Sequence, residues 1–167
     1  MHVFYRTRLN VIKTRSLFFC FCFIFFSLNL SVLTHEFSIG SIHINHPYIR
    51  FAVDSGPAAG YMTIVNTGST TDQLIRVETS FADKVELHQT LIIDNQARMK
   101  KVDYINLPSE KARSMKPGGY HIMFSGLKEK LVKGSKISVT LFFKETESIN
   151  IIFEVEDFSD SSENNSH

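Results

Sequence analysis

Short β-type runs between turn residues recur along this chain and constrain its fold more than any other feature. We find no amphipathic helix of ordinary length and no internal repeat. Turn signals stand at Asn66-Thr67-Gly68, at Asp94-Asn95 and at residues 116–119, where Lys-Pro-Gly-Gly fits a type II turn. Roughly seven to nine short strands with such close turns predict an all-β sandwich or barrel. The predicted strands are residues 37–45, 59–66, 74–79, 84–93, 96–104, 120–124, 136–143 and 149–155, and the polar stretch 108–116 is predicted to be a loop.

The first 34 residues differ from the rest and have the pattern of a targeting segment. They contain four basic and no acidic residues, followed by an apolar run from Leu17 to Phe26 and, with polar breaks, to Leu33. We predict a secretory signal over residues 1–34, with an uncleaved anchor as the alternative, because no clean Ala-x-Ala precedes His35. Both export the domain, which we place in the periplasm. Residues 158–167 are predicted to be a disordered tail, which leaves 35–157 as the folded domain.

Charge and cysteine content exclude several classes of function. Without residues 1–34, 14 basic residues stand against 17 acidic ones, a net charge of −3. Such a domain lacks the basic patch that nucleic-acid binding requires. Cys20 and Cys22 both lie in the apolar segment, so the exported domain has no disulfide or thiolate site, and neither cysteine has a convincing lipobox. With no nucleophile–base pair and no motif around paired carboxylates, we predict that the protein is not an enzyme.

Two histidines and two methionines form the pattern that carries chemistry: His88, Met99, His121 and Met123. His121 and Met123 are two apart in a predicted strand, so their side chains share a face. If residues 84–104 form a hairpin that turns at Asp94-Asn95, residue 93 pairs with residue 96, and the two residue numbers of every pair have the same sum. His88 then lies diagonally across from Met99 on one face, about 7–8 Å away. Two strand pairs can thus bring two imidazoles and two thioethers together.

The ligand types indicate the metal. Thioether sulfur is soft and neutral and favours Cu(I), and imidazole also suits copper. A zinc site more usually recruits Cys or carboxylate, and a blue-copper site needs a Cys thiolate. Taken singly, each methionine is more often core filler and each histidine an ordinary strand residue. The four together, with consistent parity, predict a Cu(I) site.

At this point the chain resembles a known family, the periplasmic copper chaperones called PCu(A)C. The spacing His-(10)-Met-(21)-His-x-Met matches the signature of that family, and the resemblance covers nearly the whole exported chain. The resemblance implies a cupredoxin-like Greek-key β-sandwich that binds Cu(I) through His88, Met99, His121 and Met123. It also implies delivery of copper to the dinuclear site of cytochrome c oxidase, through subunit II or another chaperone. The matching segments are HEFSIGSIHINHPYIR, AAGYMTIVNTG, ADKVELHQT and KPGGYHIMFSGLKEKLVKGSKISVTLFF.

The chain departs from the family pattern in three places. Tyr48 stands where Trp is common, Ser125 replaces a frequent Met or apolar residue, and residues 158–167 lack a His/Met-rich extension. A second copper site is therefore not expected. We expect a monomer.

Other functions stay open at this stage. A copper-buffering protein would use the same four residues. A copper oxygenase would chelate the metal through an N-terminal His35, and a metal-free surface module would not bind copper at all.

Further soft or imidazole side chains are expected to lie outside the site. His43 and His46 are three apart, so we expect surface histidines on opposite faces. Met62 is expected in the core. Met115 is expected in a polar loop, facing solvent, with an auxiliary role at the site as the alternative. Glu86 shares the face of His88, and we expect a solvated carboxylate there rather than an orienting partner.

Overall fold

The computed structural model describes residues 36–52 and 56–156. All described residues belong to one compact unit. The predicted signal, His35 and the predicted tail therefore lie outside the described residues. Within the described ranges, no helix is long and apolar enough to cross a membrane.

All regular structure in the described residues is β-strand, as the short alternating runs predict. β5, with 12 residues, is the longest strand, and β7, with 3 residues, is the shortest. The strands are β1 (Glu36–Ile39), β2 (Ile42–Phe51), β3 (Ala58–Asn66), β4 (Asp72–Glu78), β5 (Ala82–Ile93), β6 (Gln96–Lys101), β7 (Ile105–Leu107), β8 (Lys111–Met115), β9 (Tyr120–Leu127), β10 (Lys136–Phe143) and β11 (Ile149–Val155).

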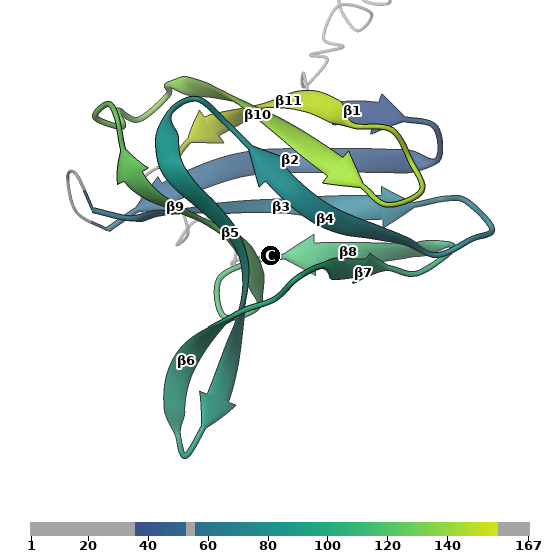
Figure 1. Ribbon diagram of the computed structural model, residues 1–167, viewed down its shortest axis with the longest axis horizontal. Helices are drawn as coiled ribbons and strands as arrows, with labels where there is room; N and C mark the ends of the chain where they lie inside the picture. Colours follow the sequence, from purple (N-terminus) through teal and green to yellow (C-terminus); the bar gives the residue numbers. More distant parts are fainter. Residues whose placement is uncertain (1–35, 53–55, 157–167) are drawn as a thin grey trace, which may run out of the picture. The chain divides into compact units, whose positions relative to one another are not determined.

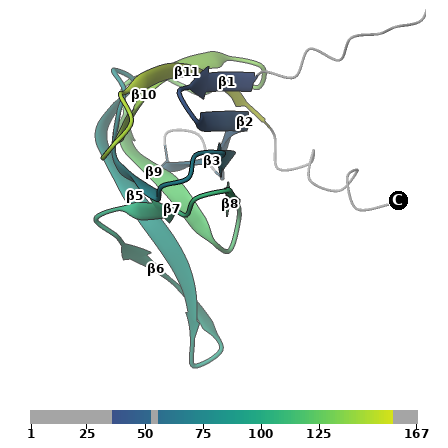
Figure 2. The same cartoon turned by 90° about the vertical axis from the view of Figure 1, so that its right-hand side faces the viewer.

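The strands join into one open sheet that curls over on itself (Figure 1). Their order is β6-β5-β9-β8-β3-β2-β11-β10-β4-β7, and β1 pairs with β2. Most neighbours are not consecutive in the chain, which is the crossing connectivity of a Greek key. Seen from the side, β10 and β11 lie over one end of the curl and β7 and β8 over the other (Figure 2). The predicted β-sandwich is confirmed.

Alternation along the strands builds the core between the two halves of the curl. In β3, Ala58, Met62 and Ile64 are buried at even positions, and Met62 is 2% exposed, as expected for a core residue. Gly60 shares that face by the same alternation, and a Cβ there would lie 2.8 Å from the ring of Phe124. The close approach of β3 to an aromatic ring therefore requires glycine.

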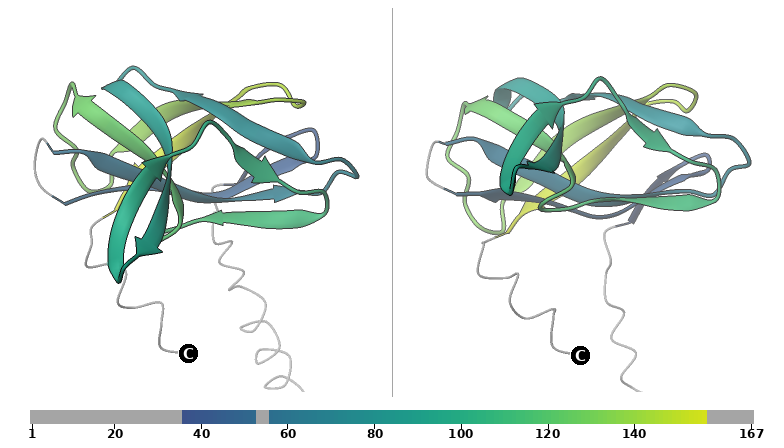
Figure 3. Two further views of the ribbon diagram at one scale, coloured as in Figure 1. Left: turned by 60° about the horizontal axis from the view of Figure 1, so that its bottom comes forward. Right: turned by 90° about the horizontal axis from the view of Figure 1, so that it is seen from below.

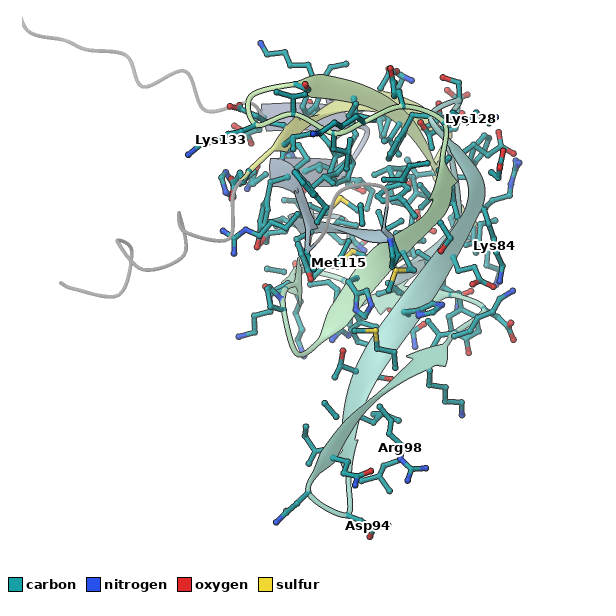
Figure 4. All side chains as sticks on the ribbon, turned by 90° about the vertical axis from the view of Figure 1, so that its left-hand side faces the viewer. Lys84, Asp94, Arg98, Met115, Lys128 and Lys133 are labelled. Carbon is teal, nitrogen blue, oxygen red and sulfur yellow. The ribbon has the colours of Figure 1, made fainter. Side chains whose placement is uncertain are left out.

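β8 and β9 both lie along β3, one after the other. Residues 111–115 pair with 66–62 of β3, and 122–124 pair with 60–58. The prediction of a loop over 108–116 is therefore wrong for residues 111–115: backbone pairing with β3 forms a strand despite the polar side chains. Met115 is 2% exposed and pairs with the buried Met62, so the expectation that it faces solvent is also wrong. Figure 4 shows Met115 away from the projecting end of β5 and β6.

The turn between β8 and β9 has the geometry that its sequence predicts. The Gly119 N–H donates to the Lys116 carbonyl at 2.9 Å, and Gly118 has a φ of 78°. A positive φ at the third turn position is the type II requirement that glycine meets without strain. This turn interrupts the pairing with β3 opposite Tyr61 and returns the chain to the sheet at Tyr120, one residue before His121.

β5 and β6 form a hairpin whose end projects from the sandwich (Figure 3). Its turn is Asp94-Asn95, with φ values of 52° and 59°, as a two-residue type I′ turn requires. Ile93 pairs with Gln96 and Thr90 with Met99, so the predicted register is confirmed. Asp94 stands at the tip (Figure 4).

Candidate metal centre

His88 and His121 lie directly opposite each other on neighbouring antiparallel strands, β5 and β9. Their ring centroids are 5.7 Å apart and the rings are inclined at 63°. Directly opposed side chains are the nearest neighbours that a sheet offers. The sheet therefore brings together two imidazoles that are 33 positions apart in sequence.

The imidazole of His121 presents a free nitrogen lone pair. Its Nδ1 lies 3.1 Å from the Gly119 carbonyl oxygen, which can only accept, so Nδ1 carries the hydrogen and donates it. Nε2 of the neutral ring is then the lone-pair nitrogen, and it is buried with no hydrogen-bond partner among the described residues. Burial lowers the pKa of His121, and the nearby His88 lowers it further. Low proton affinity and an open lone pair suit a metal ligand.

His88 has a carboxylate on one side and an unpartnered nitrogen on the other. Its Nε2 is 3.4 Å from Oε2 of Glu86, while its Nδ1 is buried with no hydrogen-bond partner among the described residues. Glu86 also accepts from Lys84 at 2.9 Å and Lys101 at 3.1 Å. These lysines lower the pKa of Glu86 to about 2. The expectation of a merely solvated carboxylate is therefore wrong, because Glu86 has three partners and contacts His88.

The two methionines occupy the same face as the histidines. Met123 pairs with Glu86 across the strands, so it is the diagonal neighbour of His88 on the side away from Ile122 and Phe124. Met99 lies on β6, which flanks β5 on the side opposite β9. It pairs with Thr90 of β5 and is therefore also a diagonal neighbour of His88. The other three predicted residues are thus neighbours of His88, and the four lie on three adjacent strands, β6, β5 and β9. They differ in exposure: His121 is 2% exposed and Met99 61%.

Tyr61 and Gly119 are parts of the site that the sequence does not reveal. The Tyr61 ring lies 6.2 Å from that of His121, from the position of β3 that β8 and β9 leave unpaired. Burial raises the pKa of Tyr61 and so keeps its phenol neutral. Gly119 supplies the carbonyl that orients His121. A backbone acceptor two residues before a ligand leaves no signal in residue type.

The other histidines of the described chain lie elsewhere. A bulge between Asn45 and Tyr48 breaks the alternation of β2, so parity does not decide the faces of His43 and His46. His46 is 72% exposed at its side chain and lies 3.0 Å from Glu156, which agrees with the expected surface position. His43 is 3.8 Å from Glu36.

Histidine, cysteine and carboxylate side chains alone do not form a metal site in the described ranges. No group of three or more His, Cys, Asp or Glu side chains there could hold a metal ion. Met99 and Met123 lie on the same face as the His88–His121 pair, so two thioethers neighbour the two imidazoles. Thioether and imidazole are donor types that copper accepts, whereas zinc more usually takes Cys or carboxylate and calcium takes oxygen ligands.

Fold and site define a cupredoxin-like β-sandwich with a histidine–methionine cluster on one sheet face. The family model described as "LpqE-like: Putative lipoprotein LpqE-like" matches residues 42–155, and the chain belongs to this family. "Putative lipoprotein Lxx21020" of Leifsonia xyli subsp. xyli (strain CTCB07) is 35% identical over 124 residues, which cover 74% of each chain.

Solved structures share the fold. The copper-bound PCuAC domain from PmoF2 has a TM-score of 0.64 and 29% identity over 74% of this chain and 98% of that one. The solution structure of CuI-DR1885 from Deinococcus radiodurans has a TM-score of 0.56 and 24% identity, over 72% of this chain and 80% of that one. These likenesses confirm the predicted cupredoxin-like fold.

Proposed function

We propose that this protein is a periplasmic Cu(I) metallochaperone that binds one ion through His88, Met99, His121 and Met123. The observation that carries the proposal is a pair of buried nitrogens on directly opposed residues, Nδ1 of His88 and Nε2 of His121, which have no hydrogen-bond partner in the described part of the chain. Buried nitrogens without a partner cost free energy, which a bound metal ion would recover. The copper-bound PCuAC domain from PmoF2, 29% identical to this chain, supports copper as that metal.

The ligand set suits a carrier rather than a redox catalyst. Neutral thioethers bind Cu(I) less tightly than thiolates do and cannot be lost to disulfides in an oxidising compartment. Met99 is 61% exposed at the hairpin, so an incoming ligand can replace it first. His121, which is buried, would keep the ion until the exchange is complete. We infer ligand-by-ligand transfer to a copper-accepting protein, such as subunit II of cytochrome c oxidase.

Export is part of the proposal. The basic and apolar pattern of residues 1–34 supports a signal, and the domain would act in the periplasm as a monomer. The family model and the Leifsonia relative both carry lipoprotein names, whereas Cys20 and Cys22 lack a convincing lipobox. Fractionation with radiolabelled fatty acid tests this point: we expect periplasmic protein without label.

Copper binding is tested by anaerobic titration with Cu(I) against a chromophoric chelator. We expect one ion per chain, and weaker binding in Met99→Ala and Met123→Ala. A wild-type protein that does not compete with the chelator would refute the site.

Delivery is tested in cells grown at low copper. Deleting the gene should lower cytochrome c oxidase activity, added copper should partly restore it, and His88→Ala should be exported and folded but fail to complement. Normal oxidase assembly at low copper, with hypersensitivity at high copper, would instead identify a copper-buffering protein.

A further inference from the structure

The carboxylate beside His88 has a role that the four-ligand pattern does not include. We propose that Glu86 is a positioning residue that selects the tautomer of His88, so that Nδ1 and not Nε2 faces the metal. The proposal rests on the proposed copper site for its purpose, but its structural content concerns the metal-free protein.

Hydrogen-bond chemistry fixes the direction of the contact. An ionised carboxylate can only accept, so the His88 nitrogen that faces Glu86 must carry the hydrogen. That nitrogen is Nε2, 3.4 Å from Oε2, a little longer than the usual N–H···O distance of about 2.7–3.2 Å. In a neutral ring the lone pair is then on Nδ1, the nitrogen that is buried without a partner. Carboxylates orient metal-binding histidines in this way in many proteins.

Glu86 is itself held in place by two lysines. Lys84 contacts Oε2 at 2.9 Å and Lys101 contacts Oε1 at 3.1 Å, so both carboxylate oxygens are engaged. The three side chains come from two strands, since Lys84 and Glu86 lie on β5 and Lys101 pairs with His88 from β6. Glu86 does not complete a group of three hard donors with the two histidines. It orients a ligand without being one.

The two histidines would then use different nitrogens. Gly119 accepts from Nδ1 of His121 and leaves Nε2 free, whereas Glu86 accepts from Nε2 of His88 and leaves Nδ1 free. The rings are inclined at 63°, so the same nitrogen of both rings need not point to a common centre. One hydrogen-bond acceptor for each ring, Glu86 for His88 and the Gly119 carbonyl for His121, thus determines which nitrogen has the free lone pair.

The experiment compares the metal-free wild type with Glu86→Ala, Glu86→Gln and Glu78→Ala. Glu78 is the matched control, since it is an exposed glutamate that contacts Arg76 instead of a histidine. Long-range ¹H–¹⁵N spectra of ¹⁵N-histidine protein at about pH 8, above the ordinary histidine pKa of about 6.5, report the tautomer. We expect Nε2–H at His88 in the wild type, Glu86→Gln and Glu78→Ala, and a mixture or Nδ1–H in Glu86→Ala.

Cu(I) affinity is then measured on the same four proteins. We expect a loss of about 10–100-fold in Glu86→Ala, the usual cost of removing such a partner, and little change in Glu86→Gln, whose amide oxygen still accepts. An unchanged tautomer in Glu86→Ala overturns the proposal. Equal copper losses in Glu86→Gln and Glu86→Ala, with Nε2–H retained in Glu86→Gln, also overturn it, because Glu86 would then be a ligand.

The two proposals fail separately. A wild type that does not bind Cu(I) refutes the copper site, while the spectra of the metal-free proteins still decide whether Glu86 sets the tautomer. Thermal unfolding of each variant checks that the sheet is intact.

Discussion

His88 and His121 face each other across β5 and β9 with ring centroids 5.7 Å apart, and each has one buried nitrogen without a hydrogen-bond partner in residues 36–52 and 56–156. The arrangement depends on two turns. The Asp94-Asn95 turn sets the register of β6 on β5 and so places Met99 beside His88, and the Lys116–Gly119 turn leads into β9 at Tyr120, one residue before His121. The two imidazoles therefore lie together on a part of the sheet whose strands are held by two defined turns.

Replacing His121 should abolish most of the stabilisation that copper gives. Binding to the folded state stabilises it by about 4 kcal/mol when the free ion is about 1,000 times Kd, which raises Tm by roughly 10 °C. We expect this shift in the wild type and in His43→Ala, and a much smaller one in His121→Ala. The measurement is thermal unfolding with and without Cu(I), with Mg²⁺ as the inert ion. An unchanged shift in His121→Ala would remove His121 from the site.

The two classes of methionine should separate cleanly under the same substitution. Met99→Leu removes a thioether from an exposed position, so we expect Cu(I) affinity to fall by more than about tenfold and stability to change by less than about 0.5 kcal/mol. Met62→Leu changes a buried core residue, so we expect unchanged affinity and a loss of less than about 1.5 kcal/mol. Chelator competition and urea unfolding measure the two quantities. Equal affinities for the two variants would contradict the role of Met99.

His121 should titrate below the ordinary histidine value of about 6.5 in the metal-free protein. Burial is the main cause of the lowered pKa, opposed by donation to Gly119 and reinforced by His88. His88→Gln should therefore raise the pKa of His121 without restoring the ordinary value. Chemical shifts of the ring protons against pH give both values. A His121 pKa above 6.5 would show that its ring is not desolvated in solution.

Asp72 should stabilise the fold at neutral pH and lose this effect in acid. Burial alone would raise its pKa, but hydrogen bonds from Thr146, Glu145 and Gln73 outweigh burial and lower it. A lowered folded pKa means that the stabilisation is present above the unfolded value of about 3.9 and disappears as the pH falls through the folded value.

Asp72→Asn should therefore cost about 1–3 kcal/mol at pH 7, and the difference from wild type should shrink towards pH 3. Urea unfolding at several pH values measures it, with the exposed Asp103→Asn as the control. A constant difference across this range would mean that the charge of Asp72 does not matter.

The sequence by itself determined the class of fold, the hairpin register and the faces of the candidate ligand residues. These features follow from local rules. Side chains alternate along a strand, Asp94-Asn95 accepts positive φ in a two-residue turn, and a two-residue turn fixes every pairing from Ile93–Gln96 to His88–Lys101. The faces of His88 and Met99 follow directly from that pairing.

The tertiary structure alone decided which strands meet. Pairing of β5 with β9 places His88 opposite His121, and pairing of β8 with β3 makes a strand, buried only at Met115, of residues that read as polar loop. Both pairings are long-range and depend on the closure of the whole sheet, which local residue type does not encode. The same holds for Glu86, whose lysine and histidine contacts require the register of β6 as well as its own strand. The sequence identified the candidate ligands, and the pairing of the strands decided which nitrogen of His88 and of His121 is free.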